Sequence, residues 1–111
     1  MSQGDGLSRL DYHVLLSMAE GPRYGYAIKE AVEVESGGAL SPRAGTLYRV
    51  IARLISDGLV EEAATPAATE PHPGRPRRYY GLTSEGRSRL SAEATRMHDA
   101  AALARRRLGK V

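Results

Sequence analysis

The segment from Ser41 to Gly58 constrains the fold of this chain more than any other part of the sequence. Ser41 followed by Pro42 is typical of a helix start, because the serine side chain accepts a hydrogen bond from the first turn and proline lacks an N–H that this turn cannot use. Gly58 predicts the helix end, since glycine readily takes the left-handed conformation that closes a helix. Apolar residues at helical spacing predict one buried face: Leu47, Val50, Ile51, Leu54 and Ile55.

The opposite face of this predicted helix is polar and basic. It carries Thr46, Arg49 and Arg53, with Tyr48 at its border and Arg43 in the first turn. A helix of this kind can dock on a small core and present guanidinium groups to the phosphates and guanine edges of a DNA major groove. The same pattern also fits an amphipathic helix whose charged face is simply solvated, so the neighbouring segments decide.

Two shorter helices are predicted before this segment. Ser8 with Asp11 has the form of a capping box, and the helix that it starts should end near Glu20-Gly21-Pro22. A second helix is predicted from about Tyr24 to Glu35, followed by a turn. The expected inward positions are Leu7, Leu10, Val14, Leu15 and Met18 in the first helix, and Tyr24, Ile28, Ala31 and Val32 in the second.

After Gly58 the pattern changes to two short strands, residues 59–63 and 77–82, joined by a loop rich in proline, alanine and threonine. Three helices followed by such a hairpin predict a mainly α, α+β fold: a winged helix-turn-helix over residues 1–82. Arg75 and Arg77 flank Pro76 in the wing, and inserted arginines favour a narrow minor groove. The pattern leaves open which of Tyr79 and Tyr80 is buried, and we expect Tyr80.

Residues 83–111 are predicted to form a long C-terminal helix, capped by Thr83 and with Glu85 in its first turn. Apolar residues step by four and three along it, which is the spacing of a coiled-coil seam. A helix of this length cannot be covered by the rest of the domain, so we expect it to pair with a second copy; the alternative is a helix folded back on its own domain. The predicted dimerisation residues are Leu90, Ala94, Met97, Ala101, Ala104 and Leu108.

Composition excludes several classes of function. The 111 residues include no cysteine, which rules out disulfides and thiolate metal sites, and the three histidines are too scattered for a metal centre. No nucleophile elbow, phosphate loop or paired carboxylate motif is present, so neither an enzyme nor a cofactor is expected. No apolar run approaches the ~20 residues of a membrane span, and the N-terminus lacks a signal pattern, so we expect a cytoplasmic protein. The net charge of +3 permits a nucleic-acid partner.

The sequence resembles the PadR family of bacterial transcriptional regulators. The resemblance rests on Gly21-Pro22 with Tyr24-Gly25-Tyr26, Gly45-Thr46-Leu47-Tyr48, Gly58-Leu59-Val60, and Gly74-Arg75-Pro76-Arg77-Arg78-Tyr79-Tyr80 with Leu82-Thr83. It implies a winged helix-turn-helix dimer that usually represses transcription and that dimerises through its long C-terminal helix. It also implies that some members bind a small effector between the subunits. Many relatives have proline where this chain has Arg49.

The resemblance also implies roles for single residues. Ser41, Thr46 and Tyr48 would contact phosphates or base edges of double-stranded DNA at the start of the third helix, and Tyr26 would contact a phosphate. Arg43 and Arg49 are the candidates for reading guanine. The implied DNA-binding set is Tyr26, Ser41, Arg43, Thr46, Tyr48, Arg49, Arg75 and Arg77.

Two further possibilities stay open at the level of sequence. A small-molecule effector pocket could lie between the first and last helices, with Tyr12, Leu15, Met97 and Ala101 as candidate walls. The chain could also be a winged helix that binds protein rather than DNA. The protein-binding alternative differs from DNA binding in its salt dependence, because the affinity of a protein for DNA falls steeply as the salt concentration rises.

Overall fold

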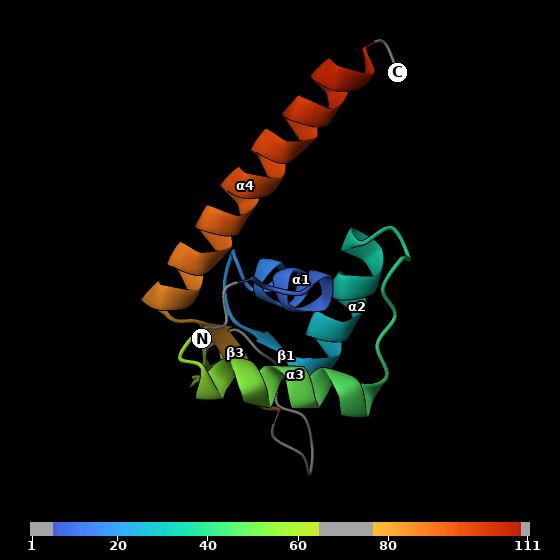
Figure 1. Ribbon diagram of the computed structural model, residues 1–111. Helices are drawn as coiled ribbons and strands as arrows, with labels where there is room; N and C mark the ends of the chain where they lie inside the picture. Colours follow the sequence, from blue (N-terminus) through green and yellow to red (C-terminus); the bar gives the residue numbers. More distant parts are fainter. Residues whose placement is uncertain (1–5, 65–76, 110–111) are drawn as a thin grey trace.

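The computed structural model describes residues 6–64 and 77–109, and within these ranges it contains four helices and three short strands. Figure 1 shows three short helices packed around a small sheet, with the fourth helix extending away from them. The order along the chain is α1 (Arg9–Ser17), β1 (Arg23–Tyr24), α2 (Gly25–Glu35), α3 (Ala44–Ser56), β2 (Val60–Ala63), β3 (Tyr79–Leu82) and α4 (Ser84–Leu108). The predicted winged helix-turn-helix with a long C-terminal helix is confirmed.

Helix α1 begins with the predicted capping box. The Ser8 hydroxyl accepts from the Asp11 N–H at 3.0 Å, and the Asp11 carboxylate accepts from the Ser8 N–H at 3.3 Å. The helix ends at Ser17, three residues before the predicted stop, because the chain then turns into β1. This two-residue strand, which the sequence pattern did not predict, pairs antiparallel with β3, placing Arg23 opposite Tyr80 and Tyr24 opposite Tyr79.

The core lies where α1, α2 and α3 meet the sheet. Helix α3 contributes its predicted inward residues Leu47, Ile51 and Leu54, which are at most 2% exposed. Its buried face is narrower than predicted, because Val50 is only half-buried and Ile55 is 40% exposed. The rest of the core cluster is Val14, Leu15, Met18, Ile28, Val32, Leu59, Val60, Tyr80 and Leu90.

Strand β3 is the middle strand of the sheet, whose order is β1-β3-β2. The predicted hairpin of β2 and β3 is present, with Val60 opposite Leu82 and Ala63 opposite Tyr79. Tyr80 lies in the core as expected, but Tyr79 is equally buried because its ring meets that of Tyr24 at a centroid distance of 5.7 Å. Both tyrosines are therefore buried, because β3 is the central strand and other residues pack on both of its faces.

Helix α4 begins at the predicted threonine cap, since the Thr83 hydroxyl accepts from the Gly86 N–H at 2.9 Å. Leu90 is 8% exposed and packs into the core of its own protomer, which corrects its assignment as a dimerisation residue. Beyond it the helix leaves the domain (Figure 1), and Met97 and Leu108 are 40% and 68% exposed. The helix therefore does not fold back on its own domain.

Candidate nucleic-acid interface

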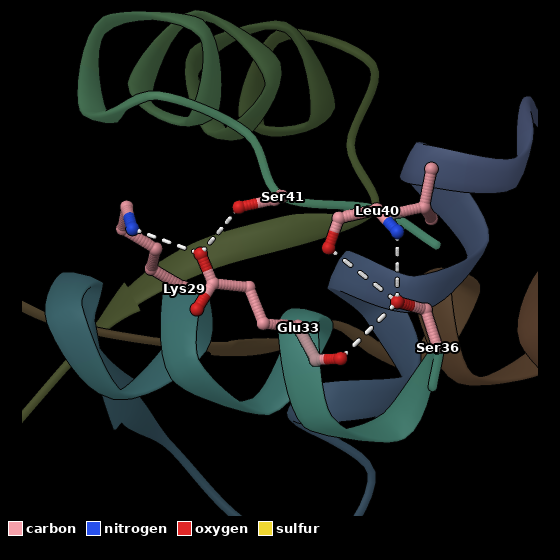
Figure 2. A network of polar contacts seen from close by, with 5 residues as sticks. All are labelled: Lys29, Glu33, Ser36, Leu40 and Ser41. Atoms are coloured by element: carbon pink, nitrogen blue, oxygen red, sulfur yellow. Dashed lines mark hydrogen bonds and ion pairs between the residues drawn. The ribbon is translucent and has the colours of Figure 1, made fainter. Parts of the chain in front are cut away.

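The connection from α2 to α3 is held by polar contacts at the end of α2 (Figure 2). The carboxylate of Glu33 accepts from the ammonium group of Lys29 at 3.0 Å and from the hydroxyl of Ser41 at 2.9 Å. The Ser36 hydroxyl accepts from the Leu40 N–H at 3.0 Å. The hydrogen bonds from Lys29 and Ser41 lower the pKa of Glu33, so this carboxylate stays ionised and keeps its partners.

These contacts correct the predicted start of α3. Ser41 is not its N-cap, because its hydroxyl is directed to Glu33 instead of to the first turn of the helix. The N-cap residue is Arg43, which has extended backbone angles and makes no side-chain cap, and the helix begins at Ala44. The chain therefore enters α3 through extended backbone at Arg43, and Ser41 before it is tied to α2.

The exposed face of α3 carries the predicted cluster of polar and basic side chains. Thr46 and Arg49 lie one turn apart, and the Arg49 guanidinium donates to the Thr46 hydroxyl at 3.4 Å. Tyr48 is 47% exposed beside them. Within the described ranges neither Arg43 nor Arg49 forms an ion pair, and both are exposed, so their charges remain available to a polyanion.

Tyr48 also links α3 to the start of α2. A side chain on Gly25 would overlap the hydroxyl end of the Tyr48 ring, so the ring lies directly on the first turn of α2. Next to Gly25, Tyr26 is 57% exposed. The structure therefore brings the N-terminal turn of α2 beside the polar face of α3. The sequence pattern did not predict that Gly25 leaves room for the Tyr48 ring, because nothing local to α2 requires a glycine there.

Arg53 does not belong to this face, although its helical position suggested that it would. Its guanidinium pairs with the Asp11 carboxylate at 2.5 Å and lies 3.8 Å from that of Asp57. The hydrogen bond to Asp11, a buried residue of α1, raises the pKa of Arg53. Arg53 therefore ties α3 to α1, although its side chain remains 50% exposed.

At the base of the wing, Arg77 stacks over the ring of Tyr24, with its guanidinium carbon 4.2 Å from the ring centroid. This cation–π contact holds the start of β3 beside the start of α2. Arg78 is exposed and lies 3.9 Å from the Glu62 carboxylate across the hairpin. Arg75 lies outside the described residues, as does most of the wing loop.

The four residues predicted as walls of an effector pocket do not line one cavity within a protomer. Leu15 is completely buried in the core, whereas Met97 and Ala101 are exposed on α4. Over the ranges that the structure describes, no group of three metal-ligating side chains comes together. Nor does any helix in those ranges have the length and apolar character needed to cross a membrane.

Residues 14–92 match the family of PadR-like transcriptional regulators. This chain belongs to that family. A protein from Streptomyces fradiae, described as an uncharacterized 37.1 kDa protein in a transposon, is 38% identical over 84 residues. That match covers 76% of this chain but 21% of the relative, so the chain spans about a fifth of that protein.

Solved structures of PadR proteins have the same fold. A PadR regulator from Clostridium difficile superposes with a TM-score of 0.72 at 22% identity, over 92% of this chain and 100% of that one. One from Eggerthella lenta gives 0.67 at 28% identity, over 92% and 83% of the two chains. Bacillus subtilis PadR, whose structure contains operator DNA, gives 0.60 at 24% identity, over 77% and 46%.

Proposed function

We propose that this PadR-family protein binds a palindromic DNA operator as a homodimer and represses transcription. The observation that carries the proposal is the polar face of α3, where Thr46, Tyr48 and Arg49 lie outside the core and Tyr48 and Arg49 are exposed. Arg53 is taken up by an ion pair with Asp11 that joins α3 to α1, whereas Arg43 and Arg49 form no ion pair within the described ranges. Bacillus subtilis PadR, whose solved structure contains operator DNA, supports the same proposal.

The proposed mode of binding follows from the arrangement of α3 and the N-terminal turn of α2, which lie side by side. Helix α3 would enter the major groove with its N-terminal half, where Arg43 and Arg49 can form paired hydrogen bonds with a guanine. The N-terminal turn of α2, with Tyr26, would meet the phosphate backbone, because free N–H groups at a helix start favour anions. Release of counterions from phosphates would supply most of the affinity, and the few base contacts would supply the specificity.

Dimerisation is proposed through the exposed part of α4. Its apolar and small residues from Ala94 to Leu108 recur at coiled-coil spacing, and Leu108 is 68% exposed in the protomer. Exposed apolar residues in a continuous stripe favour burial against a partner. A two-fold dimer would place its recognition helices in half-sites about one turn of DNA apart.

We propose that the effector pocket implied by the family lies at this dimer interface, with Tyr12, Met97 and Ala101 as walls; Leu15, the fourth predicted wall, is completely buried in the core. A thermal shift screen of phenolic and cationic aromatic compounds tests this placement. A compound that raises the Tm of the wild type, and raises that of Met97→Ala less, would support it. No shift from any compound would contradict it.

The DNA proposal is tested by selecting bound fragments from the source genome and titrating the recovered operator at several salt concentrations. Wild-type affinity should fall steeply as salt rises. Arg49→Ala should lose about 1–3 kcal/mol on the operator and relax discrimination at one base position. Arg96→Ala is the matched control, because Arg96 is an exposed arginine on α4 whose guanidinium pairs with the Glu93 carboxylate.

Two results would change the conclusion. Equal losses on operator and random DNA would make Arg49 a phosphate contact rather than a base reader. A wild-type protein that recovers no fragment, or whose binding ignores salt, would refute the DNA proposal and favour the winged helix that binds protein.

A further inference from the structure

The end of the recognition helix α3 is locked by two backbone hydrogen bonds. The Gly58 N–H donates to the Ile55 carbonyl at 3.0 Å, and the Leu59 N–H donates to the Leu54 carbonyl at 2.9 Å. Gly58 has a φ of 80°, the left-handed conformation that this helix ending requires. The carbonyl groups of Gly58 and Leu59, at this ending, accept hydrogen bonds from outside α3.

Both of these carbonyl groups are bound by Thr83, the N-cap residue of α4. The Thr83 hydroxyl donates to the Gly58 carbonyl at 2.7 Å, and the Thr83 N–H donates to the Leu59 carbonyl at 3.1 Å. The same hydroxyl oxygen accepts from the Gly86 N–H at 2.9 Å. One side chain therefore caps the start of α4 and binds the end of α3.

Gly86 brings the two backbones into direct contact. A Cβ built on Gly86 would overlap the Leu59 carbonyl oxygen and lie 2.9 Å from its carbon, although Gly86 has ordinary helical geometry. The glycine is therefore required by this close approach and not by its own backbone conformation. In Figure 1 the start of α4 and the end of α3 lie on the same side of the domain.

The length of α4 magnifies any change at this contact. From Leu90, the last anchor in the core, to Leu108 the helix rises about 27 Å at 1.5 Å per residue. A tilt of about 10° at the joint would move the far end by about 5 Å over that length. In a dimer held by α4, the same tilt would move each recognition helix along the DNA.

We infer that Thr83 and Gly86 form a rigid joint that fixes the angle between α4 and α3, and so sets the operator half-site spacing that the dimer accepts. The inference rests on the proposed function, because it needs a dimer that reads two half-sites. It assigns Thr83 as a positioning residue that does not itself contact DNA. The hydroxyl must both donate and accept, which serine can reproduce and valine cannot.

The first experiment measures affinity for operators whose half-sites are separated by one base pair more or less than in the selected site. The wild type and Thr83→Ser should prefer the native spacing equally. In Thr83→Val the ratio of native to shifted affinity should fall roughly fivefold to tenfold, comparable to the cost of one mismatched base pair. Thr83→Asp, which caps α4 but cannot donate to Gly58, should also lose part of this preference.

The second experiment measures the angle without DNA. The chain has no cysteine, so spin labels can be attached through Ala52→Cys on α3 and Ala102→Cys on α4, in dimers diluted with unlabelled protein. The distance distribution between the labels should be narrow in wild type and Thr83→Ser, and broader in Thr83→Val. Gly86→Ala should shift its mean, and Thr83→Val keeps the test available should Gly86→Ala fail to fold.

Failure of the proposed DNA-binding function and failure of the Thr83–Gly86 joint give different results. A wild-type protein that binds no operator refutes the proposed function and, with it, the claim about spacing. An unchanged spacing preference and an unchanged distance distribution in folded, DNA-binding Thr83→Val refute the joint alone.

Discussion

The ion pair between Asp11 and Arg53 allows the sharpest test of how α3 is held. Asp11 on α1 is buried and also belongs to the capping box with Ser8, so Asp11→Ala removes two kinds of interaction. A double-mutant cycle with Asp11→Ala, Arg53→Ala and the double variant cancels the capping contribution, because that contribution is lost in both variants that lack Asp11. What remains is the free energy of the pair itself.

The expected magnitude follows from the exposure of the two groups. The Asp11 side chain is 7% exposed and the Arg53 side chain 50%, so the pair lies between a surface pair and a fully buried one. Surface pairs contribute about 0.2–1 kcal/mol, and hydrogen bonds to charged groups about 1.5–3 kcal/mol. We therefore expect a coupling free energy of about 1–2 kcal/mol, and a Tm lowered by roughly 5–10 °C in Arg53→Ala.

The assay is urea unfolding at a fixed protein concentration, since dimerisation makes stability depend on concentration. Operator binding is measured well below the unfolding transition. Arg53→Ala should destabilise the fold and keep its discrimination between operator and random DNA, whereas Arg49→Ala should do the reverse. A coupling below about 0.3 kcal/mol, or an Arg53→Ala protein that loses operator discrimination at unchanged stability, would refute the assignment of Arg53 to the scaffold.

Three further predictions concern the core, the sheet and α4. Leu54→Ala should lower the free energy of unfolding by about 2–5 kcal/mol, because Leu54 is fully buried; a loss under about 1 kcal/mol in urea titration would contradict this. Burial raises the pKa of Tyr80, so this tyrosine ionises first in the unfolded chain and the free energy of unfolding should fall above pH ~10. Unfolding of Tyr80→Phe measured against pH should show a shallower fall in this free energy, and an equal fall would contradict the prediction. Ala101→Glu should give monomers by sedimentation while Ala102→Glu does not; dimers in both would remove Ala101 from the interface.

Features that depend on residues three to five positions apart could be predicted from the sequence. The Ser8–Asp11 box, the end of α3 at Gly58 and the Thr83 cap all appear as expected, because each is closed by its immediate neighbours. The cluster of Thr46, Tyr48 and Arg49 on the outer face of α3 follows from helical periodicity in the same way.

Features that depend on distant partners could not be predicted. Ser41 has the form of a cap but is bound by Glu33, and Arg53 finds Asp11 forty-two positions away. Strand β1 is only two residues long and exists because β3 offers it an edge. Gly25 and Gly86 are needed by Tyr48 and Leu59, which approach them from other elements.

Crosslinking from single surface positions tests directly whether α3 binds the operator. A photoreactive group on Gly45→Cys would stand in the first turn of α3, where an added side chain meets no atom within 4 Å. The same group on Val34→Cys, 77% exposed at the end of α2, is the control. If α3 binds the operator, position 45 crosslinks to operator DNA and position 34 does not; crosslinks from position 34 alone, or from neither, would contradict DNA binding by α3.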